Sequence, residues 1–158
     1  MRIKNCSGLI AIFIFCFSQY AFSEEKKLAP DFTLQDLSQN TLTLSSYRDK
    51  QPVMLLFWTT GCPFCREELK FLKSAYSGLE KEGLALIAID AGESTPKVNN
   101  FAKSYNFPFR ILLDTDTSVA GAFEVFGVPT YVLIDKKGYV RLTEHYFPKE
   151  KYKSIISE

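Results

Sequence analysis

The sequence has 158 residues, of which 46% are hydrophobic and 23% charged, a balance that excludes a mainly disordered or wholly membrane-embedded chain. The formal net charge is +1, and lysines and glutamates are interspersed without a basic run, so no nucleic-acid partner is expected. The length fits one ordinary domain, here residues 24–158, behind a short leader.

Residues 1–23 are predicted to be a signal peptide for export. Arg2 and Lys4 precede an apolar run from Gly8 to Phe17, which is shorter than the roughly 20 residues that span a bilayer comfortably. We expect cleavage after Ser23 and a periplasmic protein. An uncleaved membrane anchor is the alternative, and a lipid anchor on Cys16 is less favoured.

The first ordered segments are predicted to be strands. Phe32 and Leu34 alternate with polar residues, as do Leu42 and Leu44, so the two segments are expected to pair as an N-terminal hairpin. Val53 to Trp58 is a continuous apolar run, which is typical of a central strand buried on both faces.

A helix is predicted from Cys62 to just before Gly83. Its inner face is expected to carry Leu69, Leu72, Tyr76 and Leu79, with Glu68, Lys70 and Lys73 facing water. A second apolar run, Leu84 to Asp90, follows the helix. A strand, a helix and a strand in this order predict a parallel crossover unit.

The next segments are predicted to be a helix, a short strand and a short helix. Thr95 is expected to cap the first helix, with Pro96 at its first position and Val98, Phe101, Ala102 and Tyr105 on its inner face. The short strand covers Ile111 to Leu113. The short helix covers Val119 to Phe126, and Gly127 marks its end.

The C-terminal part is predicted to be a hairpin and a last helix. Tyr131–Ile134 and Tyr139–Leu142 flank Asp135-Lys136-Lys137-Gly138, a turn sequence with glycine where a positive φ is needed. Pro148 is expected to start a terminal helix that carries Tyr152, Ile155 and Ile156.

The two cysteines behind the leader carry the strongest chemical signal. Cys62-Pro63-Phe64-Cys65 stands between a predicted buried strand and an amphipathic helix. Free N–H groups and the helix dipole at a helix start favour a thiolate, so Cys62 is expected to be the nucleophile. Cys65, one turn inward, is expected to resolve the mixed disulfide. A bridge this short adds little structural stability.

A metal site is the competing interpretation of the same cysteines. A closed zinc site needs four ligands, whereas the chain behind the leader offers Cys62, Cys65 and the single His145. Copper is harder to exclude, because two thiolates and an imidazole could hold it. We assign His145 no role, and we expect no metal and no cofactor.

Several sequence features resemble the thioredoxin superfamily and its TlpA/ResA branch. The first set is Phe57-Trp58, Cys62-Pro63-Phe64-Cys65 and Gly127-Val128-Pro129-Thr130. The second set is Ala29-Pro30-Asp31-Phe32, Leu44-Ser45 and Gly92-Glu93-Ser94. The resemblance runs from Leu28 to Leu142. It implies an α/β, thioredoxin-like fold with a central mixed sheet, flanking helices and an N-terminal hairpin.

The resemblance also implies roles for four residues. Pro129 is expected to follow a cis peptide bond beside the disulfide, where it and Val128 bind a substrate segment. Trp58 is expected to pack beside the site and to contribute to substrate binding. Glu93 is expected near the cysteines, where it aids proton transfer. Without the resemblance, Pro129 with its neighbour Val128 would simply start a strand. Trp58 would be a core aromatic residue, and Glu93 a loop residue.

Three positions depart from the family pattern. Leu56 replaces the buried aspartate of thioredoxin, so a proton relay must run elsewhere, with Glu93 as the natural substitute. Gly61 replaces the tryptophan that is common before the first cysteine. Pro63-Phe64 reverses the Gly-Pro order of thioredoxin, which leaves the redox direction open.

The sequence therefore predicts an exported thiol-disulfide oxidoreductase acting on protein thiols or disulfides. The resemblance implies a reductase that serves cytochrome c maturation among other tasks. We also expect a membrane redox partner and a monomeric state. One alternative is a peroxiredoxin-like peroxidase, suggested by Thr59 three residues before Cys62, although Leu55 stands where that motif has proline. A copper-binding chaperone is the other.

Overall fold

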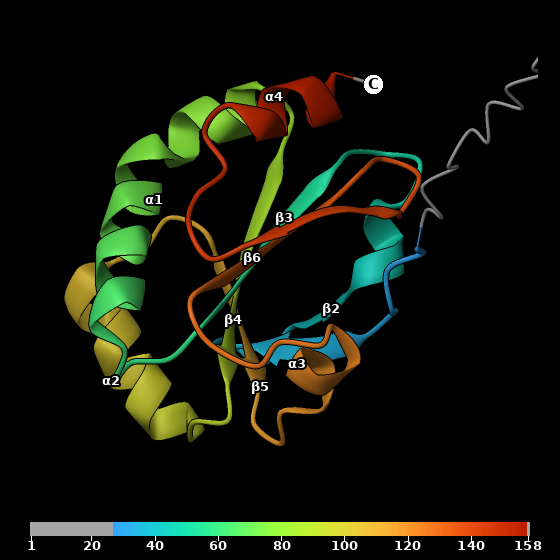
Figure 1. Ribbon diagram of the computed structural model, residues 1–158. Coiled ribbons are helices and arrows are strands. Elements are labelled where there is room, and N and C mark those ends of the chain that lie inside the picture. Colours follow the sequence, from blue (N-terminus) through green and yellow to red (C-terminus); the bar gives the residue numbers. More distant parts are fainter. Residues whose placement is uncertain (1–26, 158) are drawn as a thin grey trace, which may run out of the picture.

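The computed structural model describes residues 27–157, so the predicted signal peptide lies outside the described residues. Seven strands form a sheet in the order β2-β1-β5-β4-β3-β6-β7 (Figure 1). The strands are β1 (Thr33–Asp36), β2 (Thr41–Thr43), β3 (Val53–Trp58), β4 (Ala85–Ala91), β5 (Arg110–Asp114), β6 (Thr130–Ile134) and β7 (Val140–Glu144). The helices are α1 (Pro63–Lys81), α2 (Thr95–Tyr105), α3 (Ser118–Ala122) and α4 (Lys151–Ile156), with the 3-10 helix η1 (Leu44–Tyr47).

The centre of the sheet is parallel and its flanks are antiparallel. β3 pairs with β4, and β4 with β5, in parallel, and α1 is the crossover between β3 and β4. β6 and β7 extend the sheet antiparallel on one side, and β1 and β2 on the other. The predicted mixed sheet, parallel crossover and N-terminal hairpin are confirmed.

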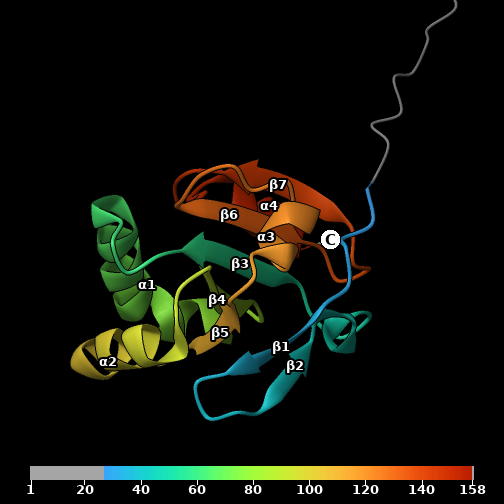
Figure 2. The same cartoon turned by 90° about the horizontal axis from the view of Figure 1, so that it is seen from below.

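Helices cover both faces of the sheet. α1 and α2 pack on one face and α3 on the other (Figure 2), and core contacts place α4 on the first face and η1 on the second. Residues of β3 alternate between the two layers: Met54, Leu56 and Trp58 face α1, while Val53, Leu55 and Phe57 face α3. Because both faces are buried, the strand is a continuous apolar run, as predicted.

The starts of α2 and α4 differ from the prediction. The carbonyl of Ser94, not Thr95, accepts the first helical bond of α2, from the N–H of Lys97 at 3.0 Å. α4 begins at Lys151, three residues after Pro148, because the Pro148 carbonyl accepts the N–H groups of Lys151 and Tyr152, each at 3.1 Å.

α3 ends earlier than predicted, at Ala122 and not at Phe126. Glu124 adopts a left-handed conformation with φ 57°, and the N–H of Val125 donates to the carbonyl of Ala120 at 2.9 Å. This arrangement closes a helix in the way a glycine usually does. Gly127 therefore does not end the helix and belongs to the loop before β6.

Within residues 27–157, no helix combines the length and the apolar character that crossing a bilayer requires.

Candidate active site

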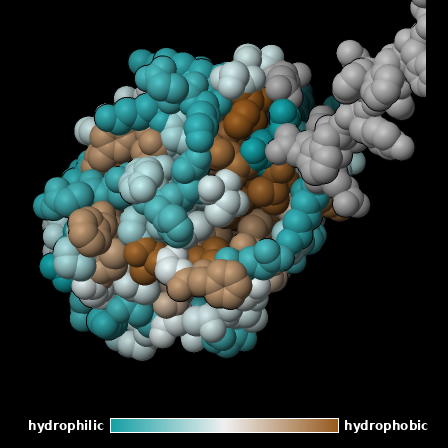
Figure 3. Space-filling view, in the orientation of Figure 1, coloured by the Kyte–Doolittle hydropathy of each residue, from teal (hydrophilic) through white to brown (hydrophobic). Residues whose placement is uncertain are grey.

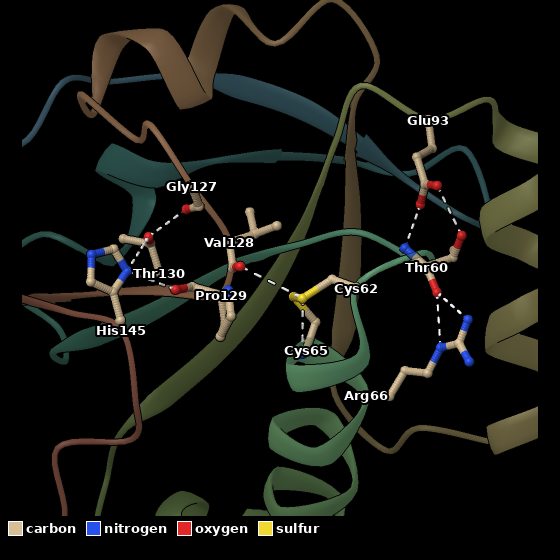
Figure 4. Close-up of a disulfide and its surroundings, with 10 residues drawn as sticks. All are labelled: Thr60, Cys62, Cys65, Arg66, Glu93, Gly127, Val128, Pro129, Thr130 and His145. Carbon is tan, nitrogen blue, oxygen red and sulfur yellow. Dashed lines mark hydrogen bonds between the residues drawn. A yellow bond between two sulfur atoms is a disulfide. The ribbon is translucent and has the colours of Figure 1, made fainter.

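The two cysteines lie where β3 gives way to α1. Cys62 is the N-cap of α1, with φ −83° and ψ 114°, and Pro63 occupies the first turn, where its missing N–H sacrifices no helical bond. Cys62 and Cys65 are joined as a disulfide with a Cα–Cα distance of 5.2 Å (Figure 4). The spacing and the helix start therefore bring the two sulfurs together.

The two sulfurs differ in exposure. Cys62 is half-buried, whereas Cys65 is 0% exposed and belongs to the core under α1. The backbone N–H of Cys65 donates to Sγ of Cys62 at 3.1 Å. After reduction, this N–H and the helix start would stabilise a negative charge on Cys62. A partner molecule can reach only the first sulfur in this conformation.

The loop before β6 forms the opposite wall of the site. The Val128-Pro129 peptide bond is cis, as predicted. The carbonyl oxygen of Val128 lies 3.6 Å from Sγ of Cys62. The hydroxyl of Thr130 donates to the Gly127 carbonyl at 2.7 Å, and Nδ1 of His145 lies 3.0 Å from the carbonyl oxygen of Pro129 (Figure 4). The loop is thus fixed beside the disulfide.

Glu93 holds the segment before Cys62 and does not itself contact a cysteine in any hydrogen bond of residues 27–157. Its carboxylate accepts the N–H of Thr60 at 2.6 Å and the Thr60 hydroxyl at 2.8 Å, and Lys97 pairs with it at 2.6 Å. Arg66 donates from Nε and Nη2 to the carbonyl of Thr60 at 3.0 and 2.9 Å. Thr60 is therefore held on three atoms, as Figure 4 shows.

The charge on Glu93 is stabilised by these contacts. Burial alone would raise the pKa of Glu93, but hydrogen bonds from Asp90, Lys97 and Thr60 outweigh it and lower the pKa to about 2. Glu93 is consequently ionised at neutral pH and suits the role of a fixed acceptor better than that of a proton donor.

Asp90 is a site residue to which the sequence reasoning gave no role. It is 0% exposed at the end of β4, and its Oδ1 accepts the N–H of Glu93 at 3.2 Å. Burial and the neighbouring Glu93 raise its pKa to about 8. The available signal was an acidic residue closing a continuous apolar run, Leu84 to Ile89.

The AhpC/TSA family profile matches residues 26–143, which is most of the chain. The chain belongs to the AhpC/TSA family. It is 38% identical over 112 residues to the thiol-disulfide oxidoreductase ResA of Bacillus subtilis, and the match covers 71% of this chain but only 62% of that protein. The ResA of Bacillus cereus is 34% identical over 131 residues, covering 80% of this chain and 75% of that protein.

The fold agrees with that of solved thioredoxin-like relatives. A solution structure from Bacteroides thetaiotaomicron, provisionally named a protein disulfide isomerase, aligns with TM-score 0.74 at 28% identity. The alignment covers 84% of this chain and 90% of the Bacteroides chain. The predicted thioredoxin-like fold and the ResA-like resemblance are thereby confirmed.

In this AhpC/TSA family member Trp58 packs in the same core cluster as Cys65, beside the site as the resemblance implies, whereas Glu68 lies elsewhere than predicted. Trp58 is 0% exposed and packs against Phe101, with 5.4 Å between ring centres, so its side chain offers no surface to a substrate. Glu68 was predicted to face water, but it is half-buried and accepts the Tyr131 hydroxyl at 2.7 Å. The helical pattern missed this because Tyr131 is 63 residues away in sequence.

A cavity of about 470 Å³ opens beside the cis-proline loop. It is lined by Phe64, Glu67, Glu68, Gly127, Val128, Pro129, His145 and Tyr146. Phe64 is 76% exposed and Tyr146 70% exposed. On the face of the molecule that Figure 3 shows, hydrophobic and hydrophilic side chains are mixed.

No three His, Cys, Asp or Glu side chains of residues 27–157 gather as a metal-binding group. The Nδ1 of His145 is engaged with the Pro129 carbonyl and lies 3.2 Å from the Thr130 hydroxyl oxygen.

Proposed function

We propose that this protein is a thiol-disulfide oxidoreductase that exchanges disulfides with protein partners, with Cys62 as nucleophile and Cys65 as resolving cysteine. The observation that carries the proposal is the difference in exposure within the bonded pair: Cys62 is half-buried at a helix start and Cys65 is fully buried. The ResA relatives, named as thiol-disulfide oxidoreductases, support it.

In the reductive direction, the Cys62 thiolate attacks one sulfur of a partner disulfide. A mixed disulfide forms, and the partner's other sulfur leaves as a thiolate and takes up a proton. Cys65 then loses its proton and attacks the Cys62 sulfur, which releases the second partner thiol. Two electrons have passed to the partner, and the enzyme ends with the Cys62–Cys65 disulfide described above.

A partner segment is proposed to lie along Val128 and Pro129. The Val128 carbonyl is 3.6 Å from the Cys62 sulfur, so a chain bound to Cys62 must pass beside it. Both residues line the 470 Å³ cavity. Glu93 is proposed to act through Thr60, by holding the backbone two residues before Cys62.

We further propose export to the periplasm, a monomeric state, reductive service and a membrane redox partner. Cytochrome c maturation is the proposed pathway, carried over from the ResA-like resemblance. The reduction potential of the Cys62–Cys65 pair tests the direction, because a potential near that of thioredoxin, about −270 mV, suits a reductant and one near that of DsbA, about −120 mV, suits an oxidant. An oxidising potential would overturn the reductive assignment.

The Cys65→Ser variant tests the nucleophile. Without the resolving thiol, mixed disulfides between Cys62 and partner proteins should accumulate and should disappear on treatment with a reductant. The variant Cys62→Ser, which keeps Cys65, is the matched control and should trap nothing, because Cys65 is buried. Equal trapping by both variants, or by neither, would contradict the proposal.

The peroxidase alternative makes a different prediction for the same thiol. A peroxidase would oxidise Cys62 far faster with hydrogen peroxide than a free cysteine reacts, whereas a disulfide exchanger would not. Stopped-flow oxidation of the reduced protein separates the two functions.

A further inference from the structure

Two buried side-chain polar atoms in residues 27–157 lack a hydrogen-bond partner, and both lie at the site. They are Nε1 of Trp58 and Oδ2 of Asp90. Trp58 and Asp90 are register partners at the ends of the adjacent parallel strands β3 and β4. An unpaired buried polar atom is costly, so the carboxyl group of Asp90 requires an explanation.

Asp114 shows that burial at the carboxyl ends of these strands does not by itself leave a carboxylate without hydrogen bonds. It ends β5, the next strand, and is also 0% exposed. Its two oxygens accept the N–H groups of Val119 at 3.1 Å and Ala120 at 2.8 Å. Asp90 instead has one oxygen on the Glu93 N–H and the other unpaired. A proton on Oδ2 would remove that defect.

We assign the Glu93 carboxylate as the acceptor for such a proton, because the Glu93 N–H already binds Asp90 at 3.2 Å. Burial raises the pKa of Asp90 to about 8, together with the interaction of its carboxyl group with that of Glu93. The Glu93 pKa is lowered to about 2. Glu93 already accepts from the Thr60 N–H, the Thr60 hydroxyl and Lys97, which favours its charged form, so a proton held by the pair belongs on the unpaired oxygen of Asp90.

We propose that Asp90 is a positioning residue of the redox site: a buried carboxylic acid that donates its proton to Glu93 and thereby keeps the Glu93 carboxylate on Thr60, two residues before Cys62. The proposal rests on the proposed function, in which Cys62 is the sulfur that partners attack. It assigns Asp90 no contact with a substrate or with the cysteines.

Loss of this proton would place two carboxylates side by side in a buried space. Their repulsion opposes the Glu93 contacts with Thr60. The charged groups that face the pair are Lys97 on α2, which is bound to Glu93, and Arg66 on α1, which holds the opposite side of Thr60. Two cations limit the displacement but do not replace the lost proton, so the Thr60 segment should loosen in alkaline solution.

Trp58 emission in the oxidised protein provides the readout. Trp58 is the sole tryptophan of the chain, it is the register partner of Asp90, and in the disulfide form the two site cysteines do not titrate. We expect one alkaline step in the emission. Asp90→Asn keeps the size and a hydrogen-bond donor but cannot titrate, so the step should be lost. Glu93→Gln removes the neighbouring charge and should move the step to lower pH.

A second measurement links the proton to the nucleophile. The rate at which dithiothreitol reduces the Cys62–Cys65 disulfide is compared between wild type and Asp90→Asn as pH rises. The ionisation of dithiothreitol cancels in the ratio of rates, which should change across the pH range of the emission step. Asp114→Asn is the matched buried control, and in it the emission step should persist.

Three results would overturn the proposal: no alkaline step in wild type, an unchanged step in Asp90→Asn, or a ratio of rates that is independent of pH. If Asp90→Asn does not fold, the wild-type titration and the Glu93→Gln shift decide. Failure of the proposed function would give a different result. In that case Cys65→Ser would trap no partner, while the alkaline step in the Trp58 emission would remain.

Discussion

Thr60 connects two charged side chains, Glu93 and Arg66, to the backbone just before Cys62. Its N–H and hydroxyl are bound by Glu93, and its carbonyl is bound by Arg66. A hydrogen bond to a charged group contributes about 1.5 to 3 kcal/mol. The hydrogen bonds of the Thr60 backbone are independent of its side chain, except that proline would remove the N–H. The hydrogen bond of the hydroxyl depends on the side chain.

Thr60→Val should therefore destabilise the protein by about 1.5 kcal/mol. Valine keeps the shape of threonine but leaves one Glu93 oxygen without its 2.8 Å donor. Urea denaturation of the oxidised protein measures the change. Thr143→Val, at an exposed position of β7, is the matched control. Equal losses in the two variants would show that the Glu93 contact adds nothing.

The Asp90–Glu93 pair predicts how stability depends on pH. The folded-state pKa of Asp90, about 8, lies above its ordinary value of 3.8, so the folded chain keeps a proton that the unfolded chain releases. The contribution of Asp90 to the free energy of unfolding therefore falls as pH rises from 3.8 to 8. Glu93 acts oppositely: its pKa of about 2 lies below 4.5, so its contribution is full above pH 4.5 and is lost toward pH 2.

Wild type should consequently lose more stability than Asp90→Asn between about pH 5 and about pH 8.5, by at least ~1.4 kcal/mol, the equivalent of one pKa unit. Urea denaturation of both proteins at the two pH values measures this difference. Parallel losses in wild type and variant would mean that Asp90 titrates alike in the folded and unfolded chain.

At the scale of elements, one side-chain bond ties α1 to β6. The Tyr131 hydroxyl donates to Glu68 at 2.7 Å, one turn after Cys65, and burial together with Glu68 raises the pKa of Tyr131. Tyr131 belongs to the strand that Pro129 precedes. The bond therefore links the helix carrying the cysteines to the strand that follows the cis-proline.

Tyr131→Phe should destabilise the protein by about 1 kcal/mol, and in a double-mutant cycle with Glu68→Ala, which removes the acceptor, most of that loss should be shared. Thermal unfolding of the four proteins gives the coupling energy. Tyr146→Phe, at a residue that is 70% exposed, controls for loss of a hydroxyl. A coupling energy of zero would show that the bond does not hold the two elements together.

The elements that the sequence predicts well are those whose pattern follows from burial. β3 and β4 are continuous apolar runs because helices cover both faces of the sheet. The end of α3 was missed because Glu124, and not a glycine, takes the left-handed conformation. Gly127 looked like the end only because glycine usually fills that position.

The features of the site also divide into those that the sequence predicted and those that it missed. The cysteine pair was predictable from its place between a strand and a helix, and the cis-proline loop was implied by the family resemblance. The Glu93–Thr60 and Glu68–Tyr131 contacts join residues 33 and 63 positions apart. Such contacts depend on how the strands assemble, which no local pattern records, and Asp90 was overlooked for the same reason.

For the molecule as a whole, the order of strands predicts which amides exchange slowly with solvent. β3 and β4 each pair on both sides, whereas β2 and β7 lie at the edges of the sheet. Hydrogen exchange of the oxidised protein should be slowest in β3 and β4 and fastest in β2 and β7. NMR or mass spectrometry resolves these segments, and faster exchange in β3 than in β2 would contradict the assigned order.

The entry point of the described chain determines how the protein can be held in an assay. Leu28 bridges Tyr139, and the N–H of Ala29 donates to Gly138 at 2.9 Å, in the turn after β6. Pro129 stands before β6, whose five residues span about 17 Å. The described chain thus enters on the side of the sheet away from the start of α1, where the disulfide lies (Figure 1). A bead, tag or electrode linked through that end would leave the sulfur pair facing the bulk solution and open to large proteins.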